Sequence, residues 1–513
     1  MEFLNRTECH FTWRLFDVDF KVPCPFWEKF KMKLHESNLV HEDDEDMERL
    51  SWQWSLRLNY AFELRHDDIE EALRQVDDVI ATLLASELPL FKRYKVSFLH
   101  TARSLKAFLL IEEMNVSVDS DEVRSLIQSI KPVSDMNAEE KSAILSARAE
   151  AVANYGADGT IKSVPFLREA IKLHPKELEW KLSLVTRLHR KRHFIRSSNL
   201  EWHEVEEAVA IMEGLLNEPG ISEQDILSTK YFLAVAYYDF IKGKPVSPDI
   251  LECRQLILTL CEEIAQKSKY PLVLSFCAER FQHLAPDETG KRKGLELIER
   301  MLSLFPLNVG VNTSASNIYK KRGMWEEAAK CSHTASQLGG YGSTWIYLEC
   351  LVILEKPFEE KKFFDDALGR FPSLFVNSTR IIAALYYFYI KRDVVRGAEY
   401  LKLVVDDDPG LHMLRTTRCN WSNSEICPLK IAYNQVMIAL KENHPFRVSM
   451  ALRNLKIKIE KLIDTSQIPT TVDLIGKFNF HQRMQKSGRC GRVRHNDRWS
   501  DTASVSSFVS WRS

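Results

Sequence analysis

The chain has 513 residues, of which 45% are hydrophobic and 27% charged, and this composition excludes an intrinsically disordered protein. Its net charge of −1 means that any affinity for nucleic acid must come from a local patch of cations. The chain is too long for one ordinary core, whereas a repeat array can grow lengthwise.

The sequence predicts a cytoplasmic protein without a membrane segment. The best apolar run, at 381–390, is about half of the roughly 20 residues that cross a bilayer, and it is interpreted as a buried helix. The ten cysteines are widely spread, as free core thiols are in a reducing compartment. Residues 1–10 contain no apolar signal region.

Residues 1–140 are expected to form a helical region with degenerate repeats. Apolar residues recur at three- and four-residue spacing in 51–64, 67–86 and 94–114. Before them, Pro23 and Pro25 interrupt any helix, because proline lacks the backbone N–H that a helix interior needs.

Residues 141–410 are expected to form the main array, with about six helical hairpins. Pro306 and Pro372 are 66 residues apart, which is two periods of 33, and Pro409 follows 37 residues later. A period near 34 is typical of the tetratricopeptide repeat (TPR). The spacing also predicts that Pro165 lies early in the second helix of its pair.

The segment 311–335 is the best example of such a hairpin. Ser316 and Ala328 are small enough to let two helix backbones approach closely, and Tyr319 fills the space beside them. Gly323 is expected at the turn, since a residue without Cβ adopts a tight turn at the lowest cost. One hairpin cannot bury its own apolar face, so neighbouring hairpins are implied.

The repeat pattern is lost at 411–425 and resumes before 464. We interpret 411–483 as capping helices. Residues 484–513 are basic and then serine-rich, with little to bury, and they are expected to form a disordered tail.

The sequence contains no phosphate-binding loop, HExxH or GxSxG motif. Cys9, His10 and Cys24 are better explained as buried groups than as a metal site, because CxxC-type spacing is absent. We therefore expect a protein that is not an enzyme and that uses no cofactor.

Basic clusters are the more informative feature. One contains Arg187 and Arg190, and another contains Lys320, Lys321 and Arg322. On the concave face of a TPR array, cations and aromatic side chains can bind phosphates and stack on bases. The aromatic candidates are Trp180, Tyr237, Tyr319, Trp345 and Tyr389. The alternative is that the cations complement helix dipoles in solvent while the aromatic rings belong to the core.

Two segments resemble the interferon-induced proteins with tetratricopeptide repeats, the IFIT family. Residues 8–13 (ECHFTW) followed by Leu15 are similar to a segment near that family's start, and 315–323 is similar to its AAKFYRRKG segment. The resemblance implies an all-α TPR superhelix. It also implies a non-catalytic, antiviral protein that holds the 5′ end of single-stranded RNA in a basic channel.

The resemblance also implies site residues. Glu8 and Thr12 would lie near the RNA 5′ phosphates, while Tyr319 and Arg322 would line the channel. Asn154 stands where the family has a lysine, which weakens the case for a triphosphate ligand. The complete candidate RNA-binding set is Glu8, Thr12, Arg187, Arg190, Tyr319, Lys320, Lys321 and Arg322.

A second hypothesis is a TPR scaffold that holds a peptide or a partner helix in its concave groove. A groove lined by apolar residues and acids such as Glu349 would favour it. The sequence leaves open which RNA, which partner and which oligomeric state apply.

Overall fold

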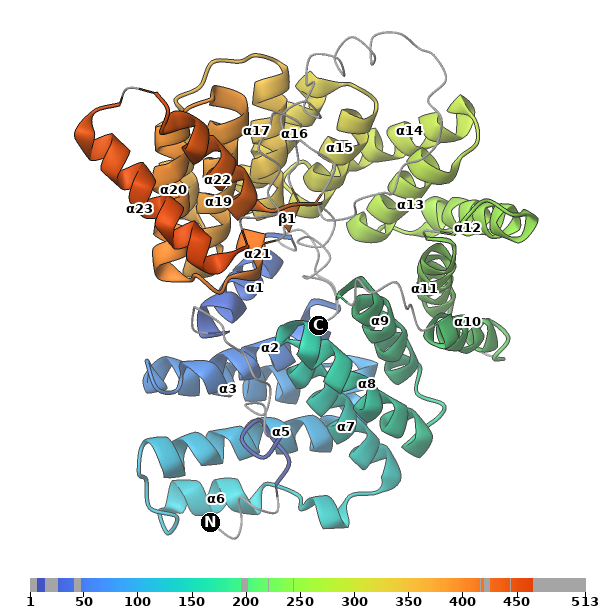
Figure 1. Cartoon of the computed structure of the whole chain (residues 1–513). Helices are drawn as coiled ribbons and strands as arrows, with labels where there is room; N and C mark the ends of the chain where they lie inside the picture. Colours follow the sequence, from blue (N-terminus) through green and yellow to red (C-terminus); the bar gives the residue numbers. More distant parts are fainter. Residues whose placement is uncertain are drawn as a thin grey trace. The chain divides into compact units, whose positions relative to one another are not determined.

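The computed structural model (Figure 1) describes most of the chain, namely residues 7–13, 26–40, 48–194, 202–219, 221–242, 244–415, 417–418, 425–442 and 444–464. Helices that follow one another in the chain pack as hairpins over most of this part. The predicted fold class, an all-α array of TPR-type helical hairpins, is therefore confirmed. Pro23, Pro25 and the predicted tail at 484–513 lie outside the described residues.

The described residues divide into two compact units, one ending at Ala315 and the other starting at Ser316. The helices of the first unit pack mainly on their neighbours along the chain. They are α1 (Phe26–Val40), α2 (Glu48–Leu64), α3 (Ile69–Ala85), α4 (Pro89–Arg93), α5 (Lys95–Phe108), the π-helical η3 (Leu109–Glu113), α6 (Asp121–Gln128), the 3-10 turn η4 (Val133–Asp135), α7 (Ala138–Ala153), α8 (Gly156–Leu173), α9 (Leu178–Phe194), α10 (Trp202–Leu216), α11 (Glu223–Ile241), α12 (Pro248–Lys267), α13 (Pro271–Leu284), α14 (Glu288–Leu304) and the first part of α15 (Val309–Lys321).

The second unit continues from within α15. Its elements are α16 (Trp325–Gln337), α17 (Tyr341–Ile353), α18 (Glu360–Arg370), the 3-10 turn η5 (Ser373–Phe375), α19 (Val376–Tyr386), the π-helical η6 (Tyr387–Lys391), α20 (Val394–Asp407), α21 (His412–Arg415), β1 (Thr417–Arg418), β2 (Glu425–Ile426), α22 (Pro428–Ala439) and α23 (Phe446–Leu462). The segment where the repeat pattern is lost thus forms a short helix and an antiparallel pairing of β1 with β2.

The hairpin at 311–335 forms as predicted. Ser316 and Ala328 are completely buried, and Tyr319 is 6% exposed. Gly323 has a φ of +74° between α15 and α16, a left-handed conformation that L side chains rarely adopt. The amide of Met324 then donates to the carbonyl of Tyr319 across the turn. The small residues and the glycine act together, because the tight turn allows the two helices to meet.

The prediction for Pro165 is wrong. Helix α8 begins at Gly156, nine residues before Pro165, so the proline lies inside the helix rather than near its start. Gly156 has a φ of +90° and allows α8 to begin three residues after the end of α7. Close packing of α7 on α8 offsets the backbone hydrogen bond that proline cannot donate.

Each unit has a hydrophobic core of its own. The first core contains side chains between Cys9 and Trp180 and includes Trp13, which is 3% exposed. The second core contains side chains between Trp345 and Ile459, with many aromatic residues from α18 to α20. Residues 7–13 are therefore part of the first core and not a free end.

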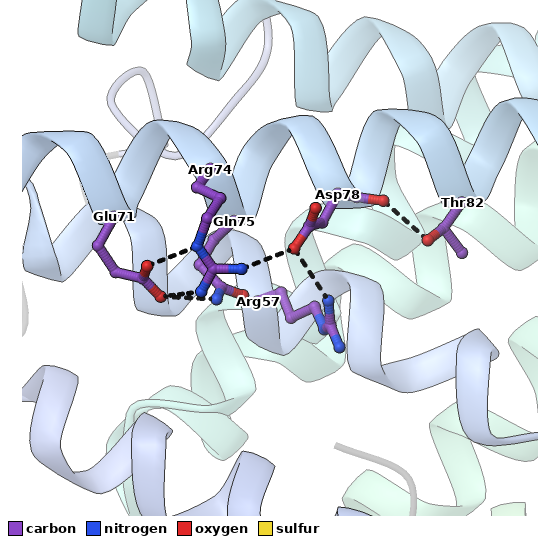
Figure 2. A network of polar contacts seen from close by, with 6 residues as sticks. All are labelled: Arg57, Glu71, Arg74, Gln75, Asp78 and Thr82. Carbon is purple, nitrogen blue, oxygen red and sulfur yellow. Dashed lines mark hydrogen bonds and ion pairs between the residues drawn. The ribbon is translucent and has the colours of Figure 1, made fainter.

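The outer side of α3 carries a polar network that also reaches α2 (Figure 2). The guanidinium of Arg74 donates to Glu71 at 2.7 Å and to Asp78 at 3.2 Å. Arg57 on α2 lies 3.9 Å from the same Asp78 carboxylate. Exposed pairs of this kind contribute about 0.3–0.5 kcal/mol each, so the core and not this network holds α3 in place.

Candidate ligand-binding site on the first helices of the hairpins

A pocket lies among α9, α11 and α13, each of which is the first helix of its hairpin. Its volume is about 770 Å³, including the solvent-filled space at its mouth. Helix α9 contacts α11 directly, and the ring of Tyr231 on α11 lies 5.3 Å from that of Phe276 on α13. The first helices of successive hairpins are thus adjacent, as Figure 1 shows for the run from α9 to α13.

The walls of the pocket are apolar and aromatic, with polar and basic side chains on one side. The apolar side chains come from α11, α13 and the turn before α13, and the main ones are Leu227, Tyr231, Phe232, Val235, Tyr270 and Leu272. Helix α9 contributes Thr186, His189 and Arg190. These three residues share one helix face because they are three and four positions apart. The pocket therefore offers ring surfaces next to a guanidinium group.

Beside the pocket, Arg187 is completely buried on α9. Its Nη2 donates to the carboxylate of Glu150 on α7, which joins the two helices. The other two guanidinium nitrogens, Nε and Nη1, have no hydrogen-bond partner among the described residues. A buried donor without a partner costs about 1–3 kcal/mol, so water or a ligand with acceptor atoms would stabilise this group.

Arg190 lies one helical turn beyond Arg187. Burial, followed by the positive charge of Arg187, lowers the pKa of Arg190 to about 9, and the carboxylate of Glu150 opposes the shift. The lowered pKa means that the charged form of Arg190 is destabilised in the folded protein. An anion bound here would stabilise the charged guanidinium, so the site favours an acidic ligand.

The ion pairs behind the pocket hold His189 in place. The carboxylate of Asp239 on α11 accepts hydrogen bonds from His189 Nδ1 and from Arg192 Nη2, both at 2.6 Å. Burial alone would raise the pKa of Asp239, but His189 and Arg192 beside it lower that pKa well below its usual range. This carboxylate is therefore charged at neutral pH and fixes the orientation of the imidazole ring.

Glu8 and Thr12 form a local turn next to α7. The hydroxyl of Thr12 donates to the carbonyl of Cys9 and accepts from its amide, both at 3.0 Å. The carboxylate of Glu8 accepts from Trp13 Nε1 at 2.7 Å and lies 3.9 Å from Arg148 on α7. These contacts bring Glu8 to the helix that also carries Glu150.

The remaining predicted residues belong to the second unit. Lys320 pairs with Glu349 on α17 at 2.6 Å, and the side chain of that glutamate is 8% exposed. Tyr319 is buried, Arg322 is half-buried and Lys321 is exposed. The candidate set thus falls into two groups, one in each unit.

Several pocket residues are absent from the candidate set deduced from the sequence. Trp180, Trp345 and Tyr389 belong to the cores, and the rings that line the pocket are Tyr231, Phe232 and Tyr270. Glu150 and Asp239 were also missed, because a carboxylate on a helix is usually solvated. The sequence did contain one signal for a buried carboxylate. Arg187 lies between the apolar residues Val185 and Leu188, which are buried in the structure, so its charge needs a buried partner.

No group of three or more His, Cys, Asp or Glu residues suited to a metal ion is found in the described segments. None of the helices described is both long enough and apolar enough to cross a bilayer.

No protein-family model matches the sequence, and neither does any curated protein. Among solved structures, human IFIT1 as a dimer with PPP-AAAA is similar to the chain at 13% identity, over 94% of this chain and 99% of that chain, with a TM-score of 0.48. The APC/C assembly Cut9–Hcn1 is similar at 12% identity, over 75% and 79%, with a TM-score of 0.29. Yeast Tom70 is similar at 11% identity, over 89% and 96%, also with a TM-score of 0.29. IFIT1 is thus a distant structural neighbour, and a likeness at this level carries no information about the ligand.

Proposed function

We propose that the protein binds the 5′ end of single-stranded RNA at the first helices of its hairpins and acts, without catalysis, as an antiviral effector of innate immunity in the cytoplasm. The observation that carries the RNA part is the pocket, in which the guanidinium of Arg190 and the rings of Tyr231 and Phe232 line the same cavity. The antiviral part is supported by the resemblance of residues 8–13 to the IFIT family.

The chemistry of the pocket supports a nucleic acid over a simple inorganic anion. Phosphate oxygens would accept from the guanidinium of Arg190, and the neighbouring rings of Tyr231 and Phe232 would contact a base. A base stacked on an aromatic side chain contributes about 1–3 kcal/mol. Inorganic phosphate would leave the apolar walls unused.

The proposal predicts salt-sensitive binding that depends on Arg190. The dissociation constant of a short single-stranded RNA is measured at two salt concentrations for the wild type and for Arg190→Gln. We expect affinity to fall steeply with added salt, because each neutralised phosphate of a single strand contributes about 0.7 to the slope of log K against log[salt]. Arg190→Gln should weaken binding about tenfold or more and reduce that slope.

Arg168→Gln is the matched control. Arg168 lies on α8, the second helix of its hairpin, where its guanidinium pairs with Glu207 at 2.7 Å and is 43% exposed. The control removes the same charge outside the pocket and should leave RNA affinity unchanged. Affinity that is independent of salt, or equal losses in both variants, would contradict the proposal.

The second candidate is a scaffold that binds a peptide, and the apolar walls of the pocket favour it. Leu227, Val235 and Leu272 would accept a hydrophobic side chain. The two functions differ in salt dependence, because insertion of an apolar side chain is little affected by moderate salt. An absence of RNA binding, together with salt-insensitive binding of a peptide that is lost in Leu227→Asp, would favour the scaffold.

A further inference from the structure

The outward face of α23 is apolar, although α23 is the last helix in the part of the chain that the structure describes. Phe446, Met450 and Ile457 are 77%, 39% and 50% exposed. At about 100° of rotation per residue, these three side chains lie within about 40° of one another and form one stripe. The end helices of a repeat array normally carry a polar outer face. An apolar stripe at this place is therefore typical of a surface that a partner covers.

The opposite side of α23 holds the helix in the fold. Leu452, Leu455 and Ile459 are buried and belong to the second core. Helix α23 packs on α20 and α22, so its position is fixed by contacts on this side. The exposed stripe takes no part in that packing. It is a surface on a rigid element, and a ligand would find it already formed.

The charges on α23 indicate what kind of ligand the face would bind. The helix carries five basic residues and one acidic residue. Three of the basic side chains, Arg447, Arg453 and Lys461, are exposed and form no ion pair with a described residue. The one acid, Glu460, lies 3.3 Å from Lys456 and accepts a hydrogen bond from Tyr433 at 3.2 Å. The face thus combines apolar contact area with cations that the fold does not neutralise.

We propose that the outward face of α23 binds a helical segment of a partner protein, and that this segment carries acidic side chains beside an apolar stripe. From Phe446 to Ile457 the stripe extends about 16 Å, or three helical turns, which suits the apolar face of a second amphipathic helix. Carboxylates beside that face would pair with the three unpaired cations. The surface belongs to the second unit, so it is separate from the pocket among α9, α11 and α13.

The same charges disfavour three other occupants. A symmetric contact between two copies would place this face against itself and bring the unpaired cations of both copies together. A lipid bilayer would surround the guanidinium of Arg453 with acyl chains, because Arg453 lies between Met450 and Ile457 along the stripe. A single strand of RNA would find one aromatic ring, that of Phe446, on which to stack.

The test uses the full chain and a synthetic helical peptide of about 15 residues, in which leucines at i, i+4, i+7 and i+11 form a stripe with glutamates beside it. A second peptide has lysine in place of each glutamate. Dissociation constants are measured by fluorescence anisotropy for the wild type, Ile457→Asp and Arg453→Glu. The wild type should bind the acidic peptide about tenfold or more tightly than the basic one.

The two substitutions separate apolar contact from charge. Ile457→Asp should weaken binding of the acidic peptide about tenfold or more, because it places a carboxylate in the apolar stripe. Arg453→Glu should weaken the acidic peptide and tighten the basic peptide, each about fivefold, because it reverses the charge within the stripe. This exchange of preference would not follow from a loss of folding.

Leu84→Asp is the matched control. Leu84 is 48% exposed on α3 in the first unit, close to the 50% of Ile457, so the two variants add the same carboxylate at equally exposed positions. The control should leave the affinity for both peptides unchanged. Thermal unfolding of every variant shows whether the fold is kept.

Several outcomes would overturn the proposal. They are an absence of binding, equal binding of the two peptides, and equal losses in Ile457→Asp and Leu84→Asp. A wild-type dimer in sedimentation that Ile457→Asp dissociates would assign the face to a second copy of the chain. Binding to phosphatidylserine vesicles that Ile457→Asp abolishes would assign it to a membrane. None of these results bears on the RNA pocket, and RNA affinity should be the same in Ile457→Asp and the wild type.

Discussion

Buried polar side chains in the first core show how one residue can determine a pH response. His10 is 1% exposed, and its Nε2 lies 2.9 Å from the amide oxygen of Asn59 on α2. Asn59 in turn donates to the carbonyl of Ala151 on α7. One short polar chain thus joins the N-terminal segment to two helices, and it depends on the protonation state of the imidazole.

Acid should destabilise the protein partly through His10. Burial lowers the pKa of His10 from 6.5 to about 4. Because the pKa in the folded state lies below that in the unfolded state, the stabilisation is complete above pH 6.5 and is lost as the pH falls through 4. Between pH 7 and 4.5 the effect is roughly 2–3 kcal/mol. Urea unfolding at both pH values should show a smaller loss for His10→Gln than for the wild type.

An equal pH dependence of stability in His10→Gln and the wild type would contradict this assignment. If His10→Gln loses as much free energy of unfolding as the wild type between pH 7 and 4.5, the buried imidazole is not responsible. Gln can still donate an amide hydrogen to Asn59, so the variant tests protonation and not the loss of the contact.

At the scale of the elements, glycines allow close contact between helices at particular positions. Gly397 on α20 faces Phe388 of η6, and a Cβ added to it would lie 2.5 Å from the aromatic ring. Phe388 is 1% exposed and is enclosed by the second core. The ring therefore has little room to move away from a larger residue.

Gly397→Ala should destabilise the second unit by about 1–3 kcal/mol, the usual effect of overpacking a core. Gly369→Ala on α18 is the matched control, because an added Cβ there meets nothing within 4 Å. It should be neutral or stabilise α18 by up to about 1 kcal/mol, since alanine favours the helical state. The midpoint of urea unfolding measures both. A similar change in the two variants would mean that the contact with Phe388 does not limit packing.

At the scale of the whole molecule, the two units have separate cores, and a change in one should be largely confined to it. In repeat proteins, each element is stabilised mainly by its neighbours. Phe364 on α18 is completely buried in the second core, among the rings of Tyr386, Tyr387 and Tyr400. The first core contains no residue of that cluster.

Phe364→Ala should cost about 3–5 kcal/mol within the second unit, because it removes a buried ring and leaves a cavity. Hydrogen exchange measured along the chain should become faster between 345 and 459, where the second core lies, and should stay unchanged in α2, α5 and α7 of the first core. Faster exchange in both cores would show instead that the two units unfold as one.

Much of the fold could be predicted from the sequence, because the responsible interactions are local in the chain. Apolar spacing indicated the helices, and Gly323 indicated the turn between α15 and α16, since its φ of +74° favours a residue without Cβ. The burial of Ser316 and Ala328 followed from their size and spacing. Pro165 was misplaced because packing between α7 and α8 outweighs the local cost of proline.

The sequence alone thus determined the helical repeat and indicated which basic residues were candidates for contact with a ligand. Only the tertiary structure decided which of those cations are buried, paired or next to a pocket. Arg187 and Glu150 are 37 residues apart, and their ion pair forms only because the fold brings α7 and α9 together. Periodicity reports which face of a helix is buried, whereas the partner of a buried charge depends on helices that are distant in sequence.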